Sequence, residues 1–112
     1  MVVGALTASS AGCLSLSCEP QLDVRHCLPD QPRCTPRDGD PVVPAGDPSL
    51  AGWPGLRDLL ESTPAGEHRH ATWNRTTEEA FWTAYGVDLD QEGKRLWVQD
   101  GEELFRVHVL SC

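Results

Sequence analysis

Residues 95–110 read RLWVQDGEELFRVHVL, two strand-like runs separated by Asp100-Gly101. Asp-Gly favours a type I′ hairpin turn, because both central positions of that turn accept φ > 0. With these two residues as the loop, Val98 would lie opposite Glu103. The alternation then places one apolar set on a single face that must be buried: Leu96, Val98, Phe105, Val107 and Val109. The stretch therefore predicts a C-terminal antiparallel hairpin.

Two short helices are predicted ahead of this hairpin. Four apolar residues at helical spacing indicate a helix over residues 54–62: Trp53, Leu56, Leu59 and Leu60. A second helix is indicated by Thr76 and Glu79, which have the spacing of a capping box, and by Gly86, which suits the left-handed position after a last turn.

The helices are expected to cover the apolar face of the hairpin, because an isolated hairpin is marginal in water. Residues 67–73 alternate weakly and offer a third strand as an alternative. The predicted fold class is α+β. A small domain over residues 50–112 would have two short helices packed on a C-terminal antiparallel β-hairpin.

Residues 13–49 are predicted to form an irregular, Pro-rich tether that carries cysteines. Proline fixes φ and has no amide donor, so neither a long helix nor a central strand is expected there. The prolines stand at positions 20, 29, 32, 36, 41, 44 and 48.

The composition is acidic and leaves room for one domain. The chain has 112 residues and a formal net charge of −8. Because no basic cluster interrupts this charge, nucleic acid is excluded as a partner. Lys94 is the single lysine, so nearly all cationic side chains are arginines. This balance is typical of halophilic proteins, whose charges are screened at high salt, and a GC-rich genome is the alternative reason for it.

The first residues resemble a lipoprotein leader. Residues 1–12 form a short apolar run followed by small residues, as in a signal segment. The sequence Ser-Ala-Gly-Cys at 10–13 resembles the lipobox of prokaryotic lipoproteins, in which the cysteine thiol carries diacylglycerol. Ser10 stands where that family usually has Leu, and the basic n-region is missing. The resemblance implies lipidation of Cys13, a membrane anchor as partner and a cell-surface location; a cytoplasmic protein and ordinary secretion are the alternatives.

The C-terminal domain also resembles small exported proteins of haloarchaea in its succession of a Leu-rich helix, a Glu-rich helix and a hairpin. This resemblance rests on pattern, without a diagnostic motif, and it implies no activity. The sequence has no apolar run of about 18 residues, so no transmembrane helix is expected.

With Cys13 used for a lipid, an even set of disulfide candidates remains: Cys18, Cys27, Cys34 and Cys112. Three connectivities are open, and each of them pairs Cys112 with one of the others. A zinc site built from Cys18, His26, Cys27 and Cys34 is the rival interpretation, although its spacing lacks the tight pairs that such sites usually have. Free thiols are expected if the chain is cytoplasmic.

The remaining histidines are not expected to form a site. His68 and His70 could face one side of a strand and offer two imidazoles to a metal, but two ligands do not make a site, so an exposed strand face is expected. His108 is expected to be a cross-strand surface residue. No catalytic residue, metal or cofactor is predicted, and the protein is expected not to be an enzyme.

Two features remain on the predicted surface. Asn74-Arg75-Thr76 is an N-x-T sequon, which makes Asn74 a glycosylation candidate in an exported chain. Trp82 and Trp97 are the candidates for a recognition patch, because neither lies on the predicted apolar face of its element.

These observations favour a non-enzymatic, membrane-anchored surface lipoprotein that acts as an interaction or structural module and has room for a protein partner. The alternative is a small cytosolic regulatory or adaptor protein with metal-binding or redox-sensitive cysteines.

Overall fold

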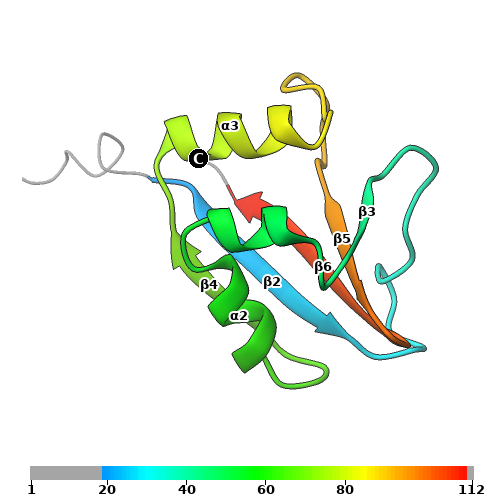
Figure 1. The fold of residues 1–112 in the computed structure, drawn as a ribbon. Coiled ribbons are helices and arrows are strands. Elements are labelled where there is room, and N and C mark those ends of the chain that lie inside the picture. The colour runs from blue at the N-terminus through cyan, green and yellow to red at the C-terminus, as the bar shows by residue number, and fades with distance from the viewer. Residues whose placement is uncertain (1–18, 111–112) are drawn as a thin grey trace, which may run out of the picture.

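Five strands form one mixed sheet in the order β3-β5-β6-β2-β4 (Figure 1). The structure is a computed structural model, and it describes residues 19–110. The strands β3 and β5 are parallel, whereas every other neighbouring pair is antiparallel. The strands are β2 (Gln21–Cys27), β3 (Val42–Pro44), β4 (His68–Thr72), β5 (Leu96–Asp100) and β6 (Glu103–Leu110).

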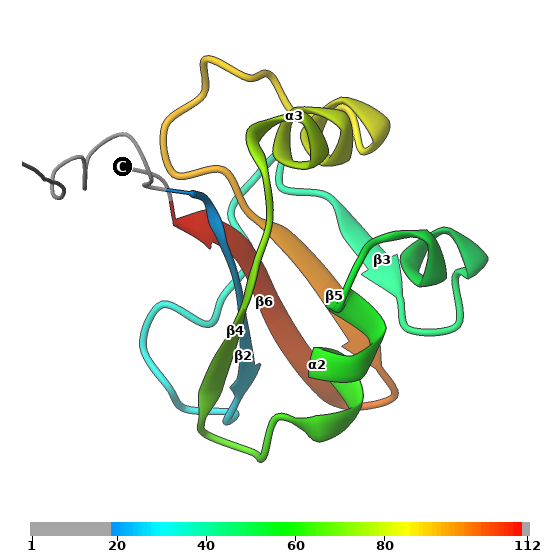
Figure 2. The ribbon, with the colours of Figure 1, turned by 90° about the vertical axis from the view of Figure 1, so that its left-hand side faces the viewer.

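The helices pack on one face of this sheet (Figure 2). They are the 3₁₀-helix η1 (Pro48–Gly52), α2 (Leu56–Ser62) and α3 (Arg75–Ala84). The predicted α+β class is confirmed. The prediction that the helices rest on a C-terminal hairpin alone is wrong, because β5 and β6 are two strands of a larger mixed sheet.

The sheet extends into the segment that was expected to be an irregular tether. β2 pairs with β6 on one side and β4 on the other, so the expectation that residues 13–49 hold no central strand is wrong. Pro20 and Pro29 bracket β2 without interrupting it, which leaves all its amide donors in place. Leu22 and Val24 are fully buried against the helices. Alternate residues of the same strand therefore point to the opposite face.

The hairpin has a different turn from the predicted one. Asp100 pairs with Glu103 and Val98 with Phe105, so the two-residue loop is Gly101-Glu102. Gly101 takes the positive φ of 62° that such a turn needs. A register shift of two residues keeps every side chain on its face. The predicted apolar face is therefore correct, although Val98 does not lie opposite Glu103.

The second helix begins two residues earlier than predicted. Asn74 is its N-cap, and the side-chain oxygen Oδ1 accepts a hydrogen bond of 2.7 Å from the backbone N–H of Thr77. Thr76 is therefore inside the helix and not its cap. The predicted end is confirmed, since Gly86 has a φ of 74°.

The loop over residues 28–41 covers part of the sheet face that points away from α2 (Figure 2). Trp97 lies beneath it with no exposed area, and its Nε1 donates a 2.9 Å hydrogen bond to Asp40 Oδ2. Arg37 forms an ion pair with the same carboxylate oxygen at 3.6 Å. The face is thus closed over β5 and stays more open over β4, where the side chains are exposed.

Candidate functional site

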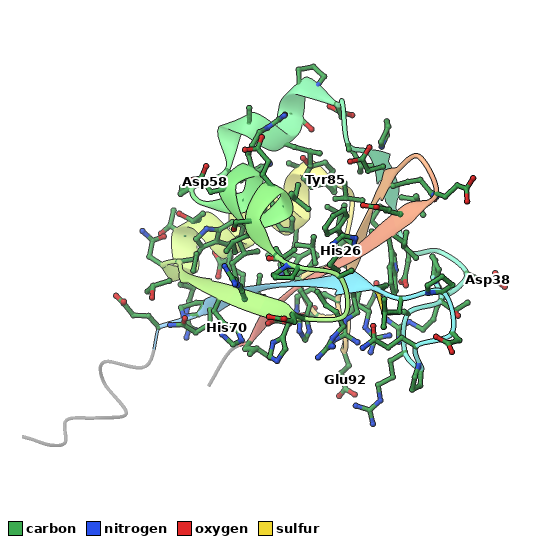
Figure 3. The ribbon with its side chains drawn as sticks, turned by 90° about the horizontal axis from the view of Figure 1, so that it is seen from below. His26, Asp38, Asp58, His70, Tyr85 and Glu92 are labelled. Atoms are coloured by element: carbon green, nitrogen blue, oxygen red, sulfur yellow. A yellow bond between two sulfur atoms is a disulfide. The ribbon has the colours of Figure 1, made fainter. Side chains whose placement is uncertain are left out.

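Three strands bring an aspartate and three histidines together on the face away from the helices. Asp23 of β2 is directly paired with His70 of β4 on one side and with His108 of β6 on the other. His68 is two residues from His70 and shares its face, because side chains alternate along a strand. Figure 3 shows His70 on the side of the sheet opposite to α2 and His26.

Asp23 is the centre of this cluster, and its side chain is 4% exposed. His68 Nδ1 lies 3.0 Å from Oδ1 and His70 Nε2 lies 2.9 Å from the same oxygen. His108 Nε2 lies 2.7 Å from the other oxygen, Oδ2. An ionised carboxylate only accepts hydrogen bonds, so His68 and His108 donate theirs to it. We call these four residues the Asp23 cluster.

The histidines hold Asp23 in its ionised form. Burial by itself would raise the pKa of Asp23, but the hydrogen bonds from His108 and His68 and the positive charges of His108 and His70 outweigh it. The pKa falls from the ordinary 3.8 to about 2. A buried carboxylate without these partners would be expensive to ionise.

The same atoms have the arrangement of metal ligands. Asp23, His68 and His70 each offer one donor atom, and the three atoms lie within 4.8 Å of one another. Donors bound tetrahedrally at about 2.1 Å from an ion are separated by roughly 3.4 Å. The present separations of 2.9 and 3.0 Å from Asp23 Oδ1 need to widen by only about half an ångström. Small movements of two half-exposed histidines would therefore admit an ion.

His108 supports this arrangement from the second oxygen of Asp23. Its 2.7 Å hydrogen bond fixes the rotation of the carboxylate and leaves Oδ1 facing His68 and His70. Partners of this kind orient metal ligands in many proteins. His108 is cross-strand to Asp23, as predicted, but it is not a surface residue, since its side chain is 23% exposed and bonded to the buried Asp23.

Sequence reasoning found two members of the cluster and missed the residue that joins them. The prediction that His68 and His70 share one strand face is confirmed. The sequence does not predict the place of Asp23, because the prolines of residues 13–49 favour a tether over a strand. The expected exposed strand face is confirmed, since both histidines are exposed on β4, but Asp23 adds a third donor atom beside them. Alternation of Leu22 and Val24 with polar neighbours was the signal that could have identified the strand.

The fourth histidine lies on the opposite face of the sheet. His26 Nδ1 is 3.0 Å from the carbonyl oxygen of Thr63, and Nε2 is 3.1 Å from Glu103 Oε1. It lines a pocket of about 520 Å³ together with Arg57 and Phe105. His26 has no contact with the Asp23 cluster and provides a matched control for it.

The predicted recognition patch does not exist at the surface. Trp82 is 1% exposed and Trp97 has no exposed area, so both predictions are wrong. Trp82 packs against Phe81 in the core, with ring centroids 4.9 Å apart. Trp97 points away from the helices, as predicted, but the loop over residues 28–41 covers it. Asn74 is exposed, and its glycosylation stays a prediction.

Cys27 and Cys34 form a disulfide at the start of that loop, with Cα atoms 5.8 Å apart. The bond occupies two thiols of the alternative zinc site, and His26 is engaged elsewhere, so that interpretation is wrong. Cys13, the lipidation candidate, lies outside the described residues. Cys18 and Cys112 also lie outside the described residues. With Cys27 and Cys34 paired, they are the remaining two of the four disulfide candidates, and their pairing stays a prediction.

Replacing Cys27 and Cys34 together with serine should lower the free energy of unfolding by about 2–3 kcal/mol, the chain-entropy value for so short a loop. The loop spans a sequence separation of 7 residues. Urea unfolding of the oxidised wild type and the double variant measures the difference. A change below about 0.5 kcal/mol, the size of an ordinary surface substitution, would contradict the stabilising role.

The low pKa of Asp23 should make the free energy of unfolding of the metal-free protein fall at acid pH. A folded-state pKa of about 2 against 3.8 means that the carboxylate stabilises the fold above pH 4 and loses that contribution as the pH falls towards 2. The contribution is about 2 kcal/mol. In urea unfolding, the advantage of the wild type over Asp23→Asn should shrink by this amount between pH 5 and pH 2. Parallel pH profiles for the two proteins would show that the histidines do not lower this pKa.

Among residues 19–110, no helix is long and apolar enough to cross a membrane. No protein-family model matches this chain, and the comparisons with curated proteins and with solved structures found no significant match.

Proposed function

We propose that the protein is a non-enzymatic module that binds a divalent first-row transition metal ion at the Asp23 cluster. The observation that supports the proposal most strongly is the gathering of three donor atoms from Asp23, His68 and His70 within 4.8 Å. Imidazole and carboxylate ligands suit Zn²⁺ and its neighbours in the first transition row. Asp23 Oδ1, His68 Nδ1 and His70 Nε2 are the proposed ligands, with His108 holding the carboxylate.

Binding is proposed rather than catalysis because this part of the sheet is open. The side chains of His68 and His70 are 45% and 42% exposed. Catalytic metal sites work in cavities that exclude water, where the metal and the protein dipoles act strongly on a substrate. An ion on an open face keeps exchangeable positions for water or for a second ligand.

Zinc binding by tag-free, EDTA-treated protein tests the proposal. Equilibrium dialysis against Zn²⁺ should give one zinc per chain by elemental analysis. Binding should also raise the melting temperature, since a ligand at 100 times its Kd stabilises the folded state by about 2.7 kcal/mol. Binding should weaken at acid pH, because the ion must displace the proton on His68 Nδ1. Absence of bound zinc together with an unchanged melting temperature would contradict the proposal.

We further propose that this module is exported and held at the cell surface by a lipid on Cys13. The Cys27–Cys34 disulfide supports an oxidising compartment. The Ser-Ala-Gly-Cys sequence at 10–13 supports lipid attachment by its resemblance to the lipobox. The cytosolic alternative needs free cysteines, and this disulfide leaves Cys27 and Cys34 without reactive thiols. In this proposal the membrane is a partner through the anchor.

Intact-mass analysis of the membrane fraction tests the anchor. The expected species begins at Cys13 and carries diacylglycerol. A soluble chain that retains Met1 and an unmodified Cys13 would overturn this part of the proposal and leave the metal site unaffected.

A further inference from the structure

Three arginines surround a fourth, Arg106, on the same sheet face, beside the Asp23 cluster. Arg106 of β6 is directly opposite Arg25 of β2. Its other register partner is Trp97 of β5, and Arg95 lies two residues before that tryptophan. Arg33 comes from the loop over residues 28–41, and its carbonyl oxygen accepts a 3.3 Å hydrogen bond from Arg106 Nη1. The charges of Arg25 on β2, of Arg95 just before β5 and of Arg33 in the covering loop thus all act on Arg106.

Arg106 is a buried cation, only 8% exposed. Among the residues that the structure describes, its Nε has no hydrogen-bond partner. Within residues 19–110, none of the four arginines has a carboxylate oxygen within 4.0 Å. Buried charges in proteins are normally paired, because removal from water is costly. This one is surrounded by charges of its own sign in a chain of net charge −8.

The arrangement destabilises the ionised guanidinium. Burial lowers the pKa of Arg106, and the positive charges of Arg25, Arg95 and Arg33 lower it further, while Asp23 opposes them. Like charges directly opposite each other on paired strands are unfavourable. An acidic or apolar residue at one of these positions would make the fold more stable. The repulsion between the arginines therefore indicates that an anion binds among them.

We propose that these four arginines bind a tetrahedral oxyanion of the phosphate class, either inorganic phosphate or a phosphomonoester. The planar guanidinium presents paired N–H donors that match phosphate oxygens, and such charge-assisted hydrogen bonds are the strong ones. Arg106 forms the floor of the site. Arg25, Arg33 and Arg95 supply donors around it and are exposed or half-exposed.

The oxyanion site adjoins the Asp23 cluster without depending on it. Arg25 is the register partner of His68 as well as of Arg106, and all three side chains share one sheet face. An oxyanion bound to Arg25 would therefore lie beside an ion held by His68. The arginines need no metal to bind an anion, so the oxyanion site can be tested in metal-free protein. The result of that test does not depend on whether the metal proposal is correct.

The test is calorimetric titration of EDTA-treated, tag-free protein at low salt, with inorganic phosphate in one arm and phenyl phosphate in the other. Wild type should bind, and Arg25→Gln should weaken binding at least about 10-fold, the loss expected for a charged hydrogen bond. Arg69→Gln is the control, because Arg69 lies on β4 next to His68 and His70 but points to the other face. It should bind as wild type does. Tighter binding in the second arm would assign the site to phosphomonoesters, and equal or tighter binding in the first arm would assign it to phosphate itself.

Thermal unfolding with and without phosphate provides a second readout. If Arg25 had a purely structural role, its replacement would not change the stabilisation by phosphate. Without phosphate, Arg25→Gln should melt at a higher temperature than wild type, because one repulsive charge is gone. With phosphate, wild type should gain stability and the variant should gain little. Two results would overturn the proposal: no binding by wild type in either arm, or equal phosphate binding by wild type and Arg25→Gln.

Discussion

Zn²⁺ is expected to bind His70→Ala at least about 100-fold more weakly than it binds the wild type. The substitution removes one of three protein ligands, and even partners outside the ligand set typically change affinity 10–100-fold. His70 is half-exposed on β4, so its loss creates no cavity in the core. Calorimetric titration of tag-free protein, after removal of metal with EDTA, measures the two affinities at one pH.

His26→Gln is the matched control for this experiment. It removes a histidine that lies on the other face of the sheet and contacts Thr63 and Glu103. Its zinc affinity should equal that of the wild type. Unchanged affinity in His70→Ala, or an equal loss in His26→Gln, would show that zinc binds elsewhere.

Replacing Trp97 with alanine should lower the free energy of unfolding by about 3–5 kcal/mol, the usual cost of truncating a buried tryptophan. Trp97 has no exposed area and donates a hydrogen bond to Asp40. The truncation would open a cavity between β5 and the covering loop and leave the Asp40 carboxylate without that donor. Urea unfolding monitored by circular dichroism measures the loss.

Trp97→Phe separates packing from the hydrogen bond. It keeps most of the apolar volume and removes the indole N–H, so its loss should be smaller than that of Trp97→Ala. A recognition residue at the surface would behave differently. If Trp97→Ala unfolded within about 0.5 kcal/mol of the wild type, as surface substitutions usually do, the covered position of Trp97 would be contradicted.

Local pattern was sufficient to predict the elements whose partners are close in sequence. The helical spacing of Leu56 and Leu59 identified α2, and alternation between residues 95 and 110 identified the hairpin. The exact turn was not predictable from Asp100-Gly101, because a loop at Gly101-Glu102 buries the same residues. Pairing along the whole length of β5 and β6 decides between these registers, and turn chemistry alone does not.

The candidate site was beyond local reasoning because its members are distant in sequence. Asp23 is 45 residues from His68 and 85 from His108. Their meeting depends on β2 entering the sheet between β4 and β6, and the surrounding prolines concealed that strand. The same error hid the arginine group, since Arg25 stands on β2 as well. Because β2 was not predicted, one residue of each proposed site was not predicted either: Asp23 of the metal site and Arg25 of the oxyanion site.

Long-range ¹H–¹⁵N spectra of histidine-labelled protein, recorded before and after one equivalent of Zn²⁺, test the metal site most directly. They observe each imidazole nitrogen separately. The signals of Nδ1 of His68 and Nε2 of His70 should move to metal-bound positions while those of both nitrogens of His26 stay unchanged. Zinc binding that leaves His68 and His70 unperturbed, or that shifts His26 instead, would contradict it.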